Sequence, residues 1–330
     1  MSSLVNIAIH PSQFPEKVRA DLAESLRTRA VNHKFHYDSV KQTQKWLALH
    51  QAHSPSRNDA DGAAIYDRSF AAAAGRNESG RIHLLGLGCG GGQKDTRLLR
   101  LLQERGKEVF YTPSDVSTAM VLTARQAALA VVPADHCFPV VCDLASADDL
   151  SAIFNQRNTQ NATRLITFFG MIPNFEPEII LPKLASLIGA EDGLLFSANL
   201  APGADYQAGV ETILPQYDNA LTRDWLLAFL FGLGVEPRDG ELRFAIEDMK
   251  GLKRVVARFH FTQSRVVALE DDRFEFRAGE SIRLFFSYRY TPGLVREALG
   301  RHGLEVLEQW ITRSEEEGVF LCRRRSEGKI

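Results

Sequence analysis

The sequence predicts an α/β fold in which a doubly wound, mainly parallel sheet carries a second, smaller α+β region. A glycine-rich turn at residues 86–92 joins the buried apolar run 82–87 to an amphipathic helical pattern that begins at Lys94. After this turn, strand-like runs alternate with helical ones, which is typical of parallel sheets. The chain closes with two strand-like runs joined by a charged turn, which predicts an antiparallel last strand.

The composition is that of an ordinary globular protein. The 330 residues are 45% hydrophobic and 24% charged, with a net charge of −2. This balance gives no reason to expect nucleic acid or a membrane surface as a partner. No apolar run is long enough to cross a bilayer, and the first residues lack a signal-peptide pattern. The four cysteines lack C-x-x-C spacing, so we expect reduced thiols and a cytoplasmic location. The oligomeric state stays open.

Five parallel strands are expected, each just before a turn or helix. They lie at residues 82–87, 109–115, 138–143, 164–170 and 193–199. Between residues 202 and 280 the alternation of strands and helices stops. A helix is expected at 224–233 and strands at 254–261 and 266–269, which predicts an inserted α+β region. The α/β pattern returns with a helix at 292–302 and strands at 304–312 and 319–324.

The first 75 residues look helical and polar, without a strand pattern, and residues 15–26 have the spacing of an amphipathic helix. This segment is rich in histidine. The spacings of its histidines match no metal-binding motif, so no metal site is expected. The residues concerned are His33, His36, His50 and His53.

The glycine turn has the features of a nucleotide-binding corner. Five of the seven residues 86–92 are glycine, and the lack of side chains lets a ligand approach the backbone closely. Gly86, Gly88 and Gly91 also satisfy the weak dinucleotide pattern G-x-G-x-x-G. A glycine-rich loop without a ligand is the alternative. The residues expected to contact a cofactor here are Gly88, Cys89, Gly90, Gly92 and Lys94.

Two aspartates follow the second and third predicted strands, at the edge where such sheets present residues to a ligand. Asp115 suits a ribose diol, because a carboxylate accepts from both hydroxyls. Asp143 suits the amino group of an adenine, with Leu144 packed on the ring. Either aspartate could instead be a helix N-cap. A nicotinamide dinucleotide would explain Gly86 and Asp115 but not the final hairpin, whereas S-adenosylmethionine explains both, since that hairpin is associated with class I methyltransferases.

Residues 87–99 resemble the first motif of the histidine-specific methyltransferases of ergothioneine biosynthesis. Five further stretches are similar to that family in the same order, at residues 34–38, 115–117, 168–175, 217–219 and 278–283. The resemblance implies a class I methyltransferase fold with a seven-stranded sheet, S-adenosylmethionine as cofactor, and a second domain that closes over the substrate. The boundaries implied are residues 1–75 plus 202–282 for the substrate-binding lid, and 76–201 plus 283–330 for the cofactor domain.

The same resemblance assigns roles to single residues. Tyr37, Phe169 and Gly170 would lie near the cofactor, and residues 283–290 would line the pocket around the substrate side chain. Asn174 and Tyr217 would hold the α-amino and carboxylate end of a small-molecule substrate. We expect both to orient the amine, with Tyr217 as a weak proton acceptor through water.

The sequence departs from the family pattern at two positions. Gly86 stands where the family usually has an acidic residue, so one hydrogen-bond acceptor near the methionine part of the cofactor is missing. Phe285 stands where histidine-specific members carry a glutamate that binds the imidazole, while the serine two residues later is kept as Ser287. Phenylalanine cannot accept an imidazole N–H, and a donor left unpaired in a closed pocket costs about 1–3 kcal/mol.

These observations predict an S-adenosylmethionine-dependent N-methyltransferase of specialised metabolism. Its substrate would be an amino acid or amino-acid-derived amine other than histidine. Two alternatives stay open from the sequence. One is an NAD(P)-dependent oxidoreductase that uses the dinucleotide pattern, and the other is a non-catalytic protein that binds S-adenosylmethionine.

Overall fold

The computed structural model describes residues 4–53, 59–155, 159 and 161–325. The chain divides into two compact units, each built from separate stretches of sequence. The first unit comprises Met1–Gln13, Pro55–Leu200 and Thr291–Ile330, and the second comprises Phe14–Ser54 and Ala201–Tyr290.

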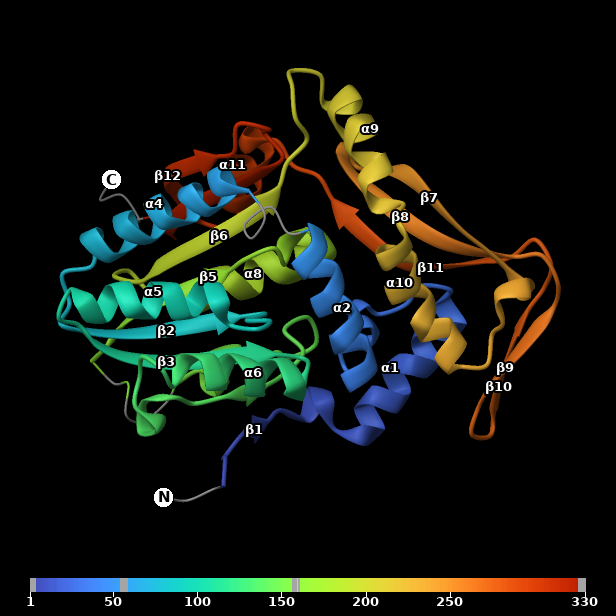
Figure 1. Ribbon diagram of the computed structural model, residues 1–330, viewed down its shortest axis with the longest axis horizontal. Helices are drawn as coiled ribbons and strands as arrows, with labels where there is room; N and C mark the ends of the chain where they lie inside the picture. Colours follow the sequence, from blue (N-terminus) through green and yellow to red (C-terminus); the bar gives the residue numbers. More distant parts are fainter. Residues whose placement is uncertain (1–3, 54–58, 156–158, 160, 326–330) are drawn as a thin grey trace. The chain divides into compact units, whose positions relative to one another are not determined.

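The first unit is built on an eight-stranded sheet (Figure 1). Its central strand is β2 (Arg81–Leu87), whose buried residues occupy both faces, as expected for a parallel strand covered on both sides. The strand β13 (Glu317–Arg324) runs antiparallel to both of its neighbours. The order across the sheet is β1 (Ala8–Ile9), β4 (Val140–Val141), β3 (Glu108–Asp115), β2, β5 (Thr163–Phe168), β6 (Gly193–Asn199), β13 and β12 (Leu304–Ile311).

Helices of the first unit fall into two groups of neighbours. One group contains α4 (Ala60–Arg76), α5 (Gln93–Glu104) and α6 (Thr118–Ala128). The other contains α7 (Leu150–Ile153), α8 (Pro177–Leu187) and α11 (Pro292–Arg301). Within the described ranges, no helix is both long and apolar enough to span a membrane.

The second unit is an α+β structure around its own apolar core. A three-stranded antiparallel sheet has the order β11 (Ser281–Tyr288), β8 (Leu252–Phe261), β7 (Gly240–Met249), and β9 (Arg265–Leu269) pairs with β10 (Asp272–Phe276). The pairing of β11 with β8 is irregular between Arg283 and Phe285. The helices of this unit are α1 (Pro15–Thr28), α2 (Val40–His53), α9 (Tyr206–Tyr217) and α10 (Ala220–Gly232).

The predicted fold class is confirmed. The seven strands β2 to β6, β12 and β13 form a mainly parallel sheet with an antiparallel last strand. Two expectations about strands were wrong. The third strand, expected at 138–143, is only the two residues of β4. The N-terminal region, expected to contain no strand, contributes β1, which pairs in parallel with β4.

The observed unit boundaries differ from the expected ones at two places. Residues 1–13 and helix α4 belong to the sheet-containing unit, because β1 extends the sheet and α4 buries an apolar face in the core of that unit. Residues 283–290 belong to the second unit, because β11 pairs with β8 as far as Tyr288.

Candidate active site

The glycine turn between β2 and α5 requires glycine at several positions. Gly88, Gly90 and Gly92 have φ angles of 64°, 52° and 71°, in the left-handed region that other residues rarely adopt. A Cβ on Gly92 would lie 2.7 Å from the Cα of Ala124 in α6. The turn therefore combines a left-handed backbone with close packing against a neighbouring helix.

Asp115, at the end of β3, lies beside this turn. Its Oδ2 accepts from the backbone N–H of Gly90 at 3.1 Å, and its Oδ1 accepts from that of Ser117 at 3.0 Å. Burial raises the pKa of this carboxyl to about 6, although these backbone N–H groups stabilise its charged form. The N-cap of α6 is Ser117 and not Asp115, so the cap alternative fails at this position.

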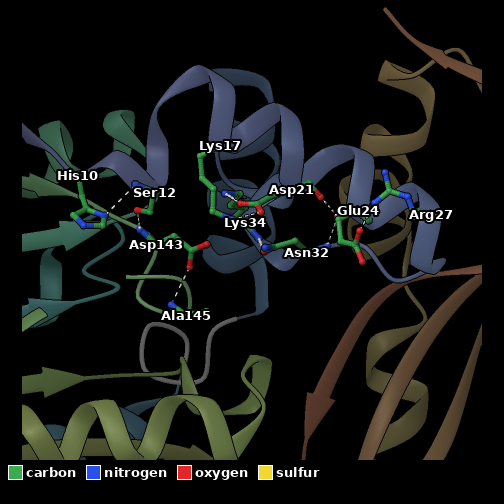
Figure 2. Close-up of polar contacts among 11 residues, drawn as sticks. His10, Ser12, Lys17, Asp21, Glu24, Arg27, Asn32, Lys34, Asp143 and Ala145 are labelled. Carbon is green, nitrogen blue, oxygen red and sulfur yellow. Dashed lines mark hydrogen bonds and ion pairs between the residues drawn. The ribbon is translucent and has the colours of Figure 1, made fainter. Parts of the chain in front are cut away.

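Asp143 and Leu144 follow β4 and are both buried. The backbone N–H of Asp143 donates to Ser12 Oγ at 3.0 Å, and its Oδ1 accepts from the Ala145 N–H at 2.9 Å (Figure 2). These bonds hold the segment after β4 against the N-terminal residues of the same unit. The N-cap of the next α-helix, α7, is Asp149, so Asp143 is not a cap for it.

Lys94, at the start of α5, lies beside the aromatic rings of Tyr66 and Phe169, and Gly170 follows Phe169 in the chain. The ammonium of Lys94 lies 3.9 Å from the ring centre of Tyr66 and 5.7 Å from that of Phe169. Gly170 has a φ of 68°, and its N–H donates to Ser197 Oγ at 2.8 Å. This arrangement gathers a cation and aromatic rings at the ends of β5 and β6.

Sequence reasoning missed two residues of this region. Tyr66, in α4, is fully buried and donates its hydroxyl to Glu317, at the start of β13. Burial and the nearby Glu317 raise the pKa of Tyr66 well above its usual value. These residues are 251 positions apart, and no local motif signals their contact.

The family pattern places an acidic residue at position 86. In this chain the side chain of Asp95 occupies the space beside that position. A Cβ on Gly86 would lie 2.1 Å from Oδ2 of Asp95, so the carboxylate of α5 fills the room that a side chain at 86 would take. Asp95 accepts from the Tyr111 hydroxyl at 2.8 Å and from Thr167 Oγ1 at 2.8 Å. Burial raises its pKa to about 6. A carboxylate of α5 therefore occupies the space beside position 86.

The second unit brings together the predicted substrate residues Tyr217, Phe285 and Ser287. The Tyr217 hydroxyl donates to Ser287 Oγ at 2.7 Å. Phe285 is 9% exposed and packs edge-on against Trp225, with ring centres 5.7 Å apart. Arg289, which the sequence did not single out, donates to the Tyr217 oxygen from Nε at 3.2 Å and Nη2 at 2.9 Å.

Tyr37 and Asn174 are on different units: Tyr37 belongs to the second unit and Asn174 to the first. Tyr37 is in the second unit, with its ring centre 5.9 Å from that of Trp46 and 5.5 Å from that of Trp225. Asn174 ends a short 3-10 helix in the first unit, where its N–H donates to the Met171 carbonyl at 3.0 Å. Asn174 and Tyr217 thus belong to different units.

The histidine-rich segment has a structural role where the structure describes it. His36 is fully buried, with Nε2 2.7 Å from the Leu284 carbonyl oxygen, and burial lowers its pKa to about 4. Its ring is therefore neutral at pH 7. Among the residues with described positions, no group of three or more His, Cys, Asp or Glu side chains is arranged to hold a metal ion.

Comparison with known families identifies this arrangement. The model of the family described as "Histidine-specific methyltransferase, SAM-dependent" matches residues 18–324. The chain belongs to this family. It is therefore an S-adenosylmethionine-dependent methyltransferase, and the nicotinamide-dependent and non-catalytic alternatives are set aside.

Individual relatives of this methyltransferase are distant. The N-methyltransferase imqF of Aspergillus flavus is 25% identical over 252 residues, which span 74% of this chain and 68% of that protein. An S-adenosylmethionine-dependent methyltransferase of Clostridium acetobutylicum has a TM-score of 0.48 at 14% identity, with 86% of this chain and 99% of that chain covered. The 1,6-didemethyltoxoflavin-N1-methyltransferase of Burkholderia thailandensis has a TM-score of 0.43 at 11% identity, with 99% and 94% covered.

The residues of the first unit fit the cofactor of this methyltransferase family. The glycine turn has a left-handed backbone at Gly88 and Gly90, and both residues are partly exposed beside the end of β2. Asp115, at the tip of the adjacent strand, offers carboxylate oxygens beside that turn. The methyltransferase thus has its polar groups where a parallel sheet presents residues to a nucleotide.

Proposed function

We propose that this methyltransferase transfers a methyl group to the nitrogen of an amino acid or amino-acid-derived amine other than histidine, in specialised metabolism. Its partner would then be a small molecule in the cytoplasm rather than a nucleic acid or a membrane. The observation that carries the proposal is Phe285, which occupies the position of the family's imidazole-binding glutamate. The relative imqF, described as an N-methyltransferase, supports nitrogen as the acceptor atom.

In this proposal, Phe285 makes the substrate site unfavourable for an imidazole. The side chain is packed against Trp225 and has its ring centre 6.1 Å from that of Tyr217. An aromatic ring in this position accepts no N–H hydrogen bond of ordinary strength. An imidazole N–H facing it would lose its partner, at a cost of about 1–3 kcal/mol. A substrate with an apolar or aromatic distal group would meet no such cost.

Cofactor binding is proposed for the first unit, with Tyr37 of the second unit as a further contact that the family resemblance implies. Gly88, Cys89, Gly90, Gly92, Lys94, Phe169 and Gly170 would surround the methionine part. Asp115 would accept from the ribose hydroxyls, and Asp143 with Leu144 would bind the adenine. S-adenosylmethionine supplies a methyl group already activated on a sulfonium, so the protein need not create a reactive group.

The chain's own contribution is to orient the acceptor amine and exclude water. Correct positioning of two reactants can lower a barrier by about 7–11 kcal/mol. We assign Asn174 and Tyr217 to the head of the substrate, with the second unit acting as the substrate-binding lid. The weak proton-acceptor role expected for Tyr217 fits poorly, because Arg289 already donates twice to its oxygen. Since its proton goes to Ser287, Tyr217 is assigned to orienting the residues around the substrate head and not to a direct hydrogen bond with the amine.

The test is methyl transfer from labelled S-adenosylmethionine to a panel of amino acids and amines. Wild type should methylate the nitrogen of at least one panel member, with the methylated atom identified by mass spectrometry. Tyr217→Phe and Asn174→Ala should reduce kcat/KM for every substrate by about tenfold or more, because both act on the shared head.

Lys107→Ala, on the turn between α5 and β3, is a matched surface variant that should keep full activity. Methylation of oxygen, sulfur or carbon only would contradict the proposed acceptor. Full activity of both head variants would contradict the assignment of the head.

A further inference from the structure

A partly buried hydrogen-bond network in the second unit has a fixed direction. The Tyr217 oxygen receives two hydrogen bonds from the Arg289 guanidinium, at 3.2 Å from Nε and 2.9 Å from Nη2. A guanidinium is always a donor and never an acceptor. Both acceptor positions of the phenol oxygen are therefore occupied, and its one proton is directed to Ser287 Oγ at 2.7 Å.

The backbone of Arg289 is held from two sides. Its N–H donates to the Lys253 carbonyl at 2.9 Å, and its carbonyl accepts from the Tyr206 hydroxyl at 2.6 Å. The same Tyr206 oxygen accepts from the Lys253 N–H at 2.8 Å. The guanidinium, 7% exposed, thus projects from a fixed point beyond the end of β11 towards the last residue of α9.

Ser287 is the end of the network. It is 1% exposed and, within the part of the chain that the structure describes, its hydroxyl contacts Tyr217 as its hydrogen-bond partner. Since Tyr217 is the donor in that bond, the proton of Ser287 itself points to another acceptor. Phe285, two residues earlier on the same strand, offers none.

We infer that Arg289 is a positioning residue that fixes Tyr217 as a donor to Ser287, so that Ser287 offers its own proton to a hydrogen-bond acceptor on the substrate. This inference rests on the proposed function for the location of the substrate, but the direction of the network does not. It narrows the substrate class: the distal group carries an acceptor without an N–H, such as a ring nitrogen, an ether or a carbonyl oxygen. Histidine, whose imidazole keeps an N–H, is disfavoured at the same point.

The direction of the network is tested first, by NMR of protein with ¹⁵N-labelled arginine. The Arg289 Nε–H resonance, assigned by its absence in Arg289→Lys, should exchange slowly with water, and Tyr217→Phe should accelerate that exchange by at least about tenfold. Arg258 is an internal control, because its Nε donates over the same 3.2 Å to Glu247 and not to Tyr217. An Arg289 exchange rate that Tyr217→Phe leaves unchanged would overturn the inference.

The substrate consequence is tested by calorimetric binding of three probes to protein loaded with S-adenosylhomocysteine. 3-Pyridylalanine carries an acceptor without an N–H, phenylalanine carries neither, and histidine carries both. Wild type should bind 3-pyridylalanine about tenfold more tightly than phenylalanine, and Ser287→Ala should abolish that ratio. A ratio that survives in Ser287→Ala would overturn the assignment of Ser287.

Turnover gives a third readout that a purely structural role would not produce. Arg289→Met and Tyr217→Phe should lower kcat/KM by similar factors, and the double variant should be no worse than either. Arg289→Lys should recover part of the loss. If no member of the amine panel is methylated on nitrogen, the proposed function fails, while the NMR comparison still decides whether Arg289 directs Tyr217.

Discussion

At the scale of single residues, burial changes the protonation of the side chains around the glycine turn. The pKa values of Asp95 and Asp115 are both raised to about 6, because neighbouring atoms remove water from the carboxylates. Asp95 accepts from the side chains of Tyr111 and Thr167, whereas Asp115 accepts only from backbone N–H groups among its described partners. Asp95 is buried, whereas Asp115 is partly exposed, so Asp115 is the one of the two that a ribose can reach.

The affinity for S-adenosylhomocysteine should depend on pH through Asp115. Ribose hydroxyls donate to the ionised carboxylate, so binding favours the deprotonated form. Below pH 6 the free protein must lose a proton to bind, and the affinity should fall by up to about tenfold per pH unit as pH decreases from 6. Above pH 7 the affinity should be constant. Calorimetric titration between pH 5 and 7.5 measures this dependence.

Asp115→Asn provides the comparison for this titration. Its affinity should be lower at pH 7.5 and nearly independent of pH over the same range, because an amide does not titrate there. The change that remains in Asp115→Asn gives the contribution of Asp95. Equal pH dependence in both proteins would show that the carboxylate at 115 does not meet the ligand.

The sequence could reveal residues that belong to a local pattern, but not residues whose partners are distant in the chain. The glycines, Asp115 and Asp143 could be predicted as cofactor residues because a strand end and a turn are local patterns. Tyr66, Glu317 and Arg289 were missed because they act through partners 251 and 72 residues away in the chain. Asp95 was also missed, because its carboxylate comes to lie beside position 86 only in the folded protein.

At the scale of elements, the turn between β2 and α5 ties the candidate cofactor site to the packing of α6. Gly92 and Gly106 have similar φ angles of 71° and 75°. A Cβ at Gly92 would meet the backbone of α6, whereas a Cβ at Gly106 would meet nothing within 4 Å. The two positions therefore separate steric contact from backbone strain.

Gly92→Ala should be more destabilising than Gly106→Ala. The strain of a left-handed alanine, about 1 kcal/mol, is common to both, and overpacking against α6 adds about 1–3 kcal/mol at Gly92 alone. Urea denaturation measures the two free energies of unfolding, and titration with S-adenosylhomocysteine measures the affinities. Gly106→Ala should bind normally and Gly92→Ala weakly. Equal losses in both variants would mean that the turn is not held by α6.

Elements with strong periodicity were predicted well, and the others were not. The predicted strand 193–199 coincides with β6, and the predicted helix 292–302 differs from α11 by one residue. β1 and β4 have two residues each, too few to form a pattern. β7 was missed because only one of its ten residues, Leu242, is buried and four of its side chains are charged.

At the scale of the whole molecule, the two units are assembled from interleaved stretches of chain. The sequence indicated an interruption of the α/β pattern at 202, close to the observed start of the second part of the second unit at Ala201. It could not assign α4, because an amphipathic helix does not specify the core into which it packs. The apolar face of α4, which includes Ile65, Tyr66 and Phe70, lies in the core of the sheet unit.

The central claim is that this methyltransferase has kept the family's cofactor and lost its preference for histidine through Phe285. Phe285→Glu restores a carboxylate that can accept an imidazole N–H, while Ser287 stays in place. The increase in selectivity for histidine should be about 1–3 kcal/mol, or 5- to 150-fold. Phe286→Glu, one residue along on the opposite face of β11, is the matched control and should give no such increase.

The most direct measurement is the ratio of kcat/KM for histidine to kcat/KM for phenylalanine, in wild type and in Phe285→Glu. We expect a ratio below one for wild type and an increase of at least about fivefold in the variant. Efficient methylation of histidine by the wild type, with a ratio well above one that Phe285→Glu does not raise, would contradict the account.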